Sequence, residues 1–266
     1  MFSRLLILIF LTAMVIIAGL AKAHAQPLAF PDAVGYGRFT RHAYAGGNPT
    51  VIKVTNLNDS GTGSLRACAE ASGNRVCAFE TSGTIVGGTT PIRIREPNIH
   101  IAGQTAPFPG IQVKRNYINV QASEVFVEHL VIRPGDDPES LAPPFDSRDA
   151  FSIRCFSGDG ELENIYVQNL TLQWGVDENM QIFPSTVSNC TATDITVDLV
   201  LNGPSLHRSK HPSGNPHGKG LIIGSNGLAN MPKRISILRN IFAHNDERNP
   251  RWSTGDQLAV LNNLMY

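Results

Sequence analysis

The sequence has few charged and few aromatic residues, and its charges balance. Charged side chains make up 17% of the 266 residues and aromatic side chains 7%. Lysine plus arginine and aspartate plus glutamate both number 22, so the formal net charge is zero. A neutral chain has no general attraction to nucleic acid or to an anionic membrane, and neither is expected as a partner. Recognition of a charged partner must therefore be local.

Helical periodicity and tight hairpin signals are also scarce. No long stretch shows a helical period, and residues 64–72 form the one plausible helix. Asn-Gly, a strong hairpin signal, occurs only at Asn202-Gly203 and Asn226-Gly227. The 24 glycines and 17 prolines predict many turns. A sandwich of short antiparallel strands is an alternative, but it would need more hairpin signals than these.

The first 25 residues are expected to be a signal peptide rather than part of the fold. Arg4 supplies a positive charge, residues 5–20 are almost wholly apolar, and Ala23-His24-Ala25 is a small-x-small cleavage pattern. A retained membrane anchor is the alternative, although the apolar run is shorter than the ~20 residues of a spanning helix. Residues 26–266 would then form one secreted, extracellular domain, which we expect to be a monomer.

Short strand-like runs fill the chain from about Ile94 onward. They are rich in β-branched residues and bounded by Gly, Pro, Asn or Asp. The expected strands are residues 99–101, 111–113, 118–120, 125–132, 165–172, 195–201, 235–242 and 258–265.

Four of these runs share the order apolar, polar, Asn or His, apolar. They are Val127-Glu128-His129-Leu130, Val167-Gln168-Asn169-Leu170, Leu238-Arg239-Asn240-Ile241 and Leu261-Asn262-Asn263-Leu264. The last two are 23 residues apart and the others 40 or more, which is typical of a solenoid. Stacked Asn side chains at one bend would bond each coil to the next. We therefore predict an all-β fold, a right-handed parallel β-helix with an Ile, Val and Leu interior.

The four cysteines contain no CxxC pair, so a structural metal site is not expected. Export would place them in an oxidising compartment, where pairing is the default. Cys68 and Cys77 flank the turn signal Ser72-Gly73-Asn74 and are expected to close a small loop. Cys155 and Cys190 would then pair across neighbouring coils.

Five ordered motifs resemble the pectate lyase family 1 of polysaccharide lyases. They are Val54-Thr55-Asn56-Leu57-Asn58-Asp59-Ser60-Gly61-Thr62-Gly63-Ser64-Leu65-Arg66, Ser82-Gly83-Thr84-Ile85, Ile101-Ala102-Gly103-Gln104-Thr105-Ala106-Pro107, Ile132-Arg133-Pro134-Gly135-Asp136 and Trp174-Gly175-Val176-Asp177-Glu178. The resemblance runs from about Ala29 to the end. It implies a parallel β-helix enzyme that cleaves de-esterified polygalacturonate by Ca²⁺-assisted β-elimination. Members of the family usually continue beyond the position of Tyr266, so the column is expected to be incomplete at its C-terminal end.

The resemblance also implies a calcium site made by acidic side chains on successive coils. Asp149, in Asp149-Ala150-Phe151-Ser152-Ile153, matches the family's Asp-Ala-x-x-Ile motif. Asp177 falls where the family has its Glu-x-x-x-Asp pair. In the alternative reading, both aspartates are turn or cap residues.

Two acids of the family's pattern are replaced, by Ser147 and Gln181. Asp146 and Glu178 are the neighbours expected to compensate, as is Asp136. Calcium binding without substrate should then be weak.

Arg248-Asn249-Pro250-Arg251 places two guanidiniums around a proline just ahead of a strand-like run. Such a pocket suits an anionic substrate, although the arginines could equally be solvated loop charges. The resemblance assigns Arg248 to the family's Arg-x-Pro base position and Lys219 to a lysine that pairs with a substrate carboxylate. Ser253 stands where the family carries a second arginine, so Arg251 would have to take that place.

Two other functions remain open at this point. The replaced acids favour a calcium-independent lyase acting on methyl-esterified pectin, but such an enzyme should have an aromatic-rich groove. The other is a β-helix that binds polysaccharide without turnover, such as an adhesin. In such a protein, Asp149, Asp177, Lys219 and Arg248 would have no common purpose. His211 and His217 lie six residues apart on a Gly/Pro loop, which favours loop or substrate contacts over a zinc site.

Overall fold

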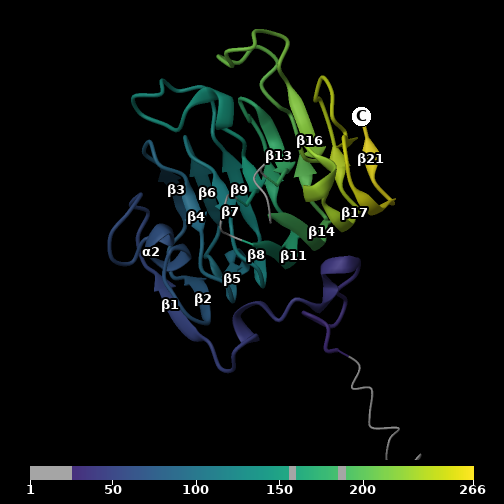
Figure 1. Ribbon diagram of the computed structural model, residues 1–266. Coiled ribbons are helices and arrows are strands. Elements are labelled where there is room, and N and C mark those ends of the chain that lie inside the picture. Colours follow the sequence, from purple (N-terminus) through teal and green to yellow (C-terminus); the bar gives the residue numbers. More distant parts are fainter. Residues whose placement is uncertain (1–25, 156–159, 185–189) are drawn as a thin grey trace, which may run out of the picture.

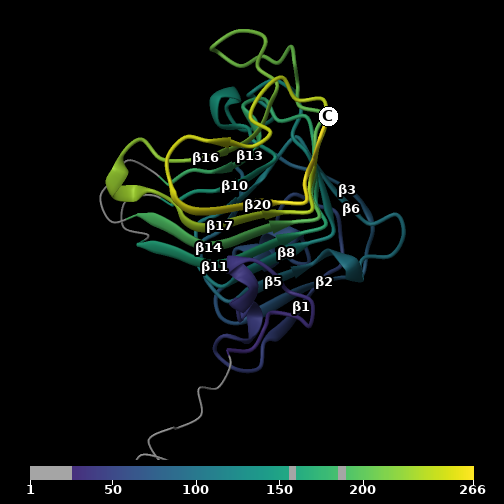
Figure 2. The same cartoon turned by 90° about the vertical axis from the view of Figure 1, so that its right-hand side faces the viewer.

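The computed structural model describes residues 26–155, 160–184 and 190–266, and these residues form a right-handed parallel β-helix (Figure 1). Every strand pair in its three sheets is parallel, as expected when each coil of a solenoid lays one strand on each sheet. Figure 2 shows the coils stacked as successive circuits of the chain. The predicted fold class is confirmed, and the sandwich alternative is wrong.

The eight-stranded sheet consists of β1 (Thr50–Val54), β2 (Arg75–Phe79), β5 (Ile99–Ala102), β8 (Val125–Glu128), β11 (Glu161–Gln168), β14 (Thr191–Asp198), β17 (Lys233–Leu238) and β20 (Asp256–Leu261). The seven-stranded sheet consists of β3 (Gly83–Val86), β6 (Ile111–Lys114), β9 (Leu130–Arg133), β12 (Thr171–Leu172), β15 (Leu201–Asn202), β18 (Ile241–Phe242) and β21 (Leu264–Met265). The six-stranded sheet consists of β4 (Ile92–Ile94), β7 (Ile118–Val120), β10 (Phe151–Ile153), β13 (Glu178–Ile182), β16 (Lys219–Ile223) and β19 (Arg251–Trp252).

Several strands were not predicted from the sequence. The strand-like runs were placed from about Ile94 onward, but β1 to β4 precede that region. Within it, β10, β13, β16 and β19 were also missed, and these four strands carry the candidate site.

The core runs the length of the column and is built from aligned aliphatic residues. On the six-stranded sheet, Ile118, Phe151, Met180 and Leu221 occupy one register row, and all four are buried. Stacking equivalent apolar positions in this way removes a continuous apolar surface from water.

The sharp bend between the eight- and seven-stranded sheets is made by one residue per coil with a positive φ. These residues are His129, Asn169, Leu199, Arg239 and Asn262, with φ between 50° and 57°. Register pairs Val127, Val167, Val197, Ile237 and Val260 across the coils. The predicted superposition of the last two repeats was therefore wrong by one residue, because Arg239 and Asn262, rather than Asn240 and Asn263, align with His129.

Coil-to-coil asparagine contacts are nevertheless present at and beside this bend. Asn169 Nδ2 lies 3.1 Å from His129 Nε2 on the preceding coil. One position further along, Asn240 Oδ1 accepts from the Val200 amide at 2.8 Å, and Asn263 Oδ1 accepts from the Asn240 amide at 2.9 Å. The side chains of Asn240 and Asn263 thus satisfy backbone N–H groups of the preceding coil at this bend.

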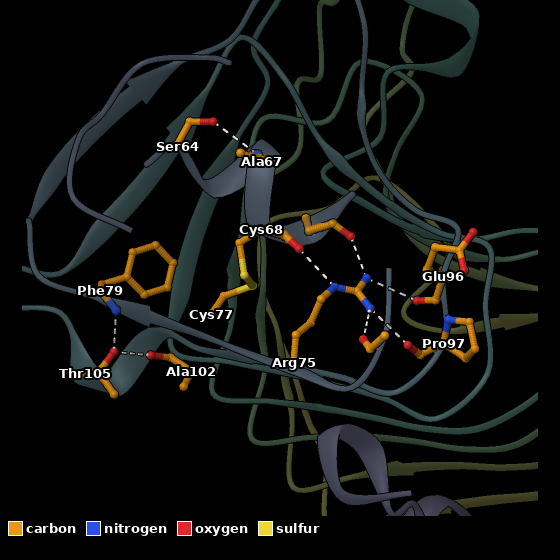
Figure 3. Close-up of a disulfide and its surroundings, with 12 residues drawn as sticks. Ser64, Ala67, Cys68, Arg75, Cys77, Phe79, Glu96, Pro97, Ala102 and Thr105 are labelled. Carbon is orange, nitrogen blue, oxygen red and sulfur yellow. Dashed lines mark hydrogen bonds between the residues drawn. A yellow bond between two sulfur atoms is a disulfide. The ribbon is translucent and has the colours of Figure 1, made fainter. Parts of the chain in front are cut away.

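The α-helix α2 (Leu65–Ala69), which follows two short 3₁₀ helices, closes the N-terminal end of the column. Ser64 caps it by accepting a hydrogen bond from the Ala67 amide at 3.1 Å, which agrees with the helix predicted over residues 64–72. Figure 3 shows the Cys68–Cys77 disulfide that ties α2 to β2. Cys155 and Cys190 also form a disulfide, so both predicted pairings are confirmed.

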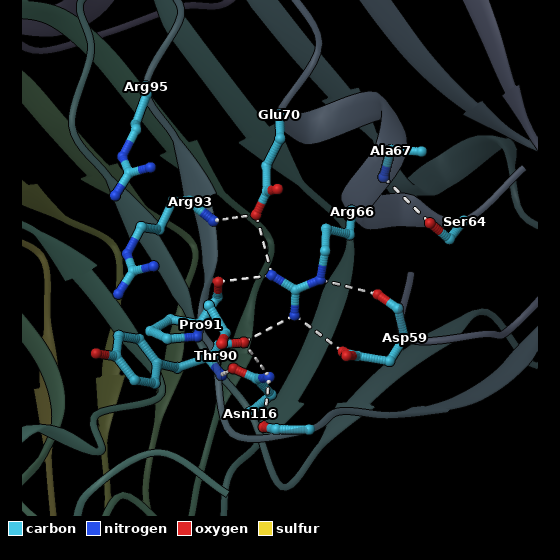
Figure 4. Close-up of polar contacts among 12 residues, drawn as sticks. Asp59, Ser64, Arg66, Ala67, Glu70, Thr90, Pro91, Arg93, Arg95 and Asn116 are labelled. Atoms are coloured by element: carbon cyan, nitrogen blue, oxygen red, sulfur yellow. Dashed lines mark hydrogen bonds and ion pairs between the residues drawn. The ribbon is translucent and has the colours of Figure 1, made fainter. Parts of the chain in front are cut away.

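Two buried arginines complete this cap. Arg75 donates all five of its N–H groups to backbone carbonyls at 2.7–3.1 Å, including those of Cys68 and Ala69 at the end of α2 (Figure 3). Arg66 bonds Asp59, Glu70 and the carbonyls of Thr90 and Pro91 (Figure 4). Arg66 therefore fixes the turn that leads into β4.

Among the residues described, no helix is long and apolar enough to cross a bilayer. The predicted signal peptide, residues 1–25, lies outside the described residues.

Candidate active site

The six-stranded sheet places four charged residues near the same end of successive strands. Ser152, Gln181, Ile222 and Arg251 form one register row across β10, β13, β16 and β19. The four charged residues each come three positions earlier on their own coil: Asp149, Glu178, Lys219 and Arg248. These residues lie 29, 41 and 29 positions apart in the sequence, and the coiling of the chain brings all four to one end of the sheet.

Asp149 is fully buried beneath this row. Its Oδ1 accepts from the Glu178 amide at 3.2 Å, and its Oδ2 accepts from the Gln181 side-chain amide. Burial, reinforced by the nearby Asp177 carboxylate, raises the pKa of Asp149 well above its usual range. One carboxylate oxygen from each of Asp149, Asp177 and Glu178 lies within 4.8 Å of the others. The two predicted aspartates and Glu178 are thus brought together.

Two histidines of the 209–219 loop contact the outer side of Asp177. His217 Nε2 lies 2.9 Å from Asp177 Oδ1, and His211 Nε2 lies 3.6 Å from the same oxygen. The two rings are stacked with their centroids 3.6 Å apart. Ser213 donates its amide to His211 Nδ1 at 3.1 Å, which leaves the proton of a neutral His211 on Nε2, facing Asp177. His211 therefore turns a protonated Nε2 toward Asp177, although 3.6 Å is too long for a hydrogen bond.

Arg248 reaches the same carboxylates from the coil that carries β19, two coils beyond Glu178. Its Nη1 forms an ion pair with Glu178, and its Nε lies 3.7 Å from Glu247 Oε1. The residue has a φ of 65°, and its carbonyl accepts from the Leu221 amide at 2.6 Å, which anchors the bend on β16. Burial lowers the pKa of Arg248.

Lys219 opens β16 beside Arg248. Its side chain is mostly buried, and its Nζ lies 3.8 Å from Glu247 Oε1. That distance is long for a hydrogen bond, so the ammonium is held loosely and can turn toward a ligand.

These side chains surround an open depression of about 420 Å³. It is lined by Asp146, Arg154, Asp177, Glu178, Gln181, Phe183, His211, Ser213, His217, Lys219, Ile222 and Arg248. Of the residues predicted for the site, Asp149 lies beneath this surface, and Arg251 is exposed on β19 and does not line the depression. Two residues near the site were not predicted from the sequence. Arg154 directly follows the motif that begins at Asp149, and Glu247 directly precedes Arg248.

The three clustered carboxylates suit a hard cation. Calcium takes six to eight oxygen ligands, and carboxylates are its usual protein ligands. Burial and, after it, the nearby Asp177 carboxylate raise the pKa of Asp149, and a divalent cation would favour the charged form of both acids. Gln181 occupies Asp149 Oδ2 with an amide, and Glu178 is shared with Arg248, so the protein supplies few free oxygens.

Sequence comparison relates this chain to fungal proteins. It is 30% identical over 259 residues to a probable pectate lyase C of Aspergillus fumigatus, covering 95% of this chain and 51% of that protein. It is also 30% identical over 257 residues to a probable pectate lyase C of Neosartorya fischeri, with the same coverage. It is 28% identical over 251 residues to a probable pectate lyase C of Emericella nidulans, covering 93% of this chain and 49% of that protein. The chain therefore spans about half the length of the curated relatives it matches.

Structural comparison supports the fold. The crystal structure of Jun a 1, the major allergen from cedar pollen, superposes with a TM-score of 0.62 and 19% sequence identity, covering 88% of this chain and 64% of that chain. No protein-family model matches the sequence.

Proposed function

Because this chain belongs to the pectate lyase family, we propose that it is a polysaccharide lyase that cleaves de-esterified polygalacturonate by β-elimination. In this reaction, the C5 proton of a uronate leaves, a C4–C5 double bond forms, and the C4–O glycosidic bond breaks. The products are a new reducing end and an unsaturated uronide.

The observation that carries the proposal is the convergence of acids and bases in one depression on the six-stranded sheet. Arg248 is the proposed base, because it is partly buried and its pKa is lowered. Lys219 is proposed to bind a substrate carboxylate through Nζ, since a charged amine gives a strong hydrogen bond to a carboxylate. Arg251, which lies outside the depression, would contact a neighbouring sugar instead.

Asp149, Asp177 and Glu178, with Asp146 at the rim, are proposed to hold Ca²⁺. When bound, the cation would supply charge stabilisation for the substrate carboxylate as the C5 proton is lost. His217 orients Asp177 by a hydrogen bond at 2.9 Å, and the His211 ring stacks on His217.

Absorbance of the unsaturated product tests this function. Purified protein is incubated with polygalacturonate, with calcium or with chelator, and we expect product only with calcium. Product formed in chelator would instead support the second candidate, a calcium-independent lyase acting on methyl-esterified pectin. The Gln181 amide on Asp149 favours that candidate, because an amide replaces a cation ligand there. If no product forms under either condition, with methylated or unmethylated polymer, the protein is not a lyase. Polysaccharide binding without turnover would then be the remaining function.

We also propose that the protein is secreted and that residues 26–266 form its mature domain. The two disulfides support export, because such bonds persist in oxidising compartments. Mass spectrometry of the exported protein should give an N-terminus at Gln26; a retained Met1 would contradict cleavage.

A further inference from the structure

A second hollow lies on the same six-stranded sheet, over the preceding coils. It has a volume of about 480 Å³ and is lined in part by Arg93, Arg95 and Arg154. Arg154 and Gln181 line both this hollow and the candidate active site. The two depressions therefore adjoin along the direction in which the coils stack.

The balance of charge differs between the two hollows, because the acids of the candidate active site are matched there by Arg154, Lys219 and Arg248. Three acidic residues line the candidate active site, whereas none of the nine residues that line the second hollow is acidic. Arg93 is held at its backbone by Glu70, and Arg95 Nε donates to Gln121 at 3.1 Å. Figure 4 shows the Arg93 and Arg95 side chains extending to the same side, away from Arg66. The second hollow is thus a cationic surface with no acidic side chain in its lining.

Its floor carries buried polar atoms without protein partners. Asn119 Oδ1 and Ser152 Oγ have no hydrogen-bond partner among the described residues. The two residues are 5% and 1% exposed and line the hollow. Buried polar atoms are almost always satisfied, so this floor is prepared for a polar ligand. The guanidiniums of Arg93, Arg95 and Arg154 line the same hollow, so we expect the ligand to be negatively charged.

We propose that this hollow binds a uronate carboxylate of the same polymer chain whose scissile bond lies in the candidate active site. This inference rests on the proposed function. Arg93 and Gln181 occupy one register row, three strand spacings apart. At about 4.8 Å per spacing, they are roughly 14 Å apart. The hollow therefore takes a sugar remote from the bond that breaks, with Arg93 and Arg95 on its carboxylate and the floor oxygens accepting from its hydroxyls.

Kinetics on substrates of different length test the assignment. Replacing both cations in Arg93→Gln/Arg95→Gln should raise KM for polygalacturonate about tenfold and leave kcat nearly unchanged, because the contact is remote from chemistry. Short oligogalacturonates that fill only the candidate active site should keep their wild-type KM. Arg41→Gln is the matched control, since Arg41 is exposed and lies on the N-terminal segment. An equal KM for variant and control on the polymer would overturn the proposal.

Binding without turnover separates this inference from the proposed function. Calorimetric titration of polygalacturonate in chelator should show about tenfold weaker binding for the double variant than for the Arg41→Gln control. If wild-type protein forms no unsaturated product yet the double variant loses polymer binding, the lyase proposal fails and the subsite stands. If the loss is the same with fully methyl-esterified polymer, or if inorganic phosphate at equal charge competes equally well, the assignment to a uronate is wrong. Equal melting temperatures of both variants would show that the fold is intact; if the double variant unfolds, Arg95→Gln alone is used.

Discussion

Arg248 combines a proposed chemical role with an unusual environment. Its guanidinium is partly buried, forms an ion pair with Glu178 and lies close to Glu247. Burial lowers the pKa of Arg248, while the carboxylates of Asp177 and Asp149 oppose the shift. A neutral guanidine is therefore more accessible than in water, although the charged form still dominates at neutral pH.

Arg248→Lys should lower kcat by at least about 100-fold, the usual effect of removing a general base, with little change in KM. A lysine keeps the positive charge beside Glu178, so the melting temperature should change little. Wild-type activity should also rise toward alkaline pH, where more of the guanidine is neutral. Product absorbance across a pH series measures both effects, and Arg41→Lys, at an exposed arginine of the N-terminal segment, is the control. Turnover near wild type in Arg248→Lys would remove this residue from the base role.

A second residue-scale prediction concerns acid stability and His42. Burial and the facing His100 lower the pKa of His42 to about 4, against the attraction of Glu128. The unfolded chain therefore binds a proton that the folded chain excludes between pH 6.5 and about 4. The stability that neutral His42 provides is complete above pH 6.5 and is lost as the pH falls through this window.

The loss should approach 3 kcal/mol at pH 4, since each pKa unit corresponds to about 1.4 kcal/mol. Denaturant unfolding of the wild type and His42→Phe from pH 4 to pH 7 measures it. His244→Phe, at an exposed histidine, is the control. Parallel curves for the wild type and His42→Phe would show that His42 does not carry the acid sensitivity.

The site residues that the sequence revealed were those inside recognisable motifs. Asp149 and Asp177 were found in this way, and the structure brings them together. Arg154 was missed because its contribution depends on where the coil turns, not on local pattern. Its neighbour in space, Gln181, was noted only as a missing acid, yet it bonds Asp149 directly.

At the scale of elements, strand periodicity failed on the sheet that matters most. β13 reads Glu-Asn-Met-Gln-Ile, and all five of its residues are buried. The polar members face covering loops and the site, so the sequence lacks the alternation of apolar and polar residues that marks a half-buried strand. The eight-stranded sheet, with its aliphatic register rows, was found more easily. Where the strand contributes to the site, functional polar residues occupy positions that would otherwise be apolar.

Arg75 holds together the cap at the N-terminal end of the column. It is completely buried, its five donors each meet a backbone carbonyl, and burial lowers its pKa to about 10. Lysine offers only three donors and no planar fork, so carbonyls at the end of α2 would lose their partners.

Arg75→Lys should therefore destabilise the protein by about 3 kcal/mol, as is typical when a buried hydrogen-bond network is broken. Thermal unfolding should shift downward by roughly 2–4 °C per kcal/mol for a domain of this size. Arg41→Lys, at an exposed arginine, should leave the melting temperature unchanged. A shift below 2 °C in Arg75→Lys would mean that the disulfide between Cys68 and Cys77 suffices to hold the cap.

For the whole molecule, the proposed cation couples the site to the stability of several coils. Asp149, Asp177 and Glu178 belong to two coils, and Arg248 on a third is paired to Glu178. A ligand that binds only the folded chain stabilises it by mass action, by about 2.7 kcal/mol at one hundred times its dissociation constant. Calcium should therefore raise the melting temperature as its concentration increases, without any substrate.

Asp177→Asn should shift this calcium titration to higher concentration, because it removes one charged ligand while leaving the stacked coils in place. Magnesium should stabilise less at equal concentration, since it requires stricter geometry and loses water reluctantly. Differential scanning fluorimetry of the wild type, Asp177→Asn and an Asp32→Asn control, at a carboxylate exposed on the N-terminal segment, measures the shift. An identical titration for Asp177→Asn and the wild type would place the cation elsewhere. The melting temperature reports binding even if the chain is inactive, so the metal site can be judged separately from catalysis.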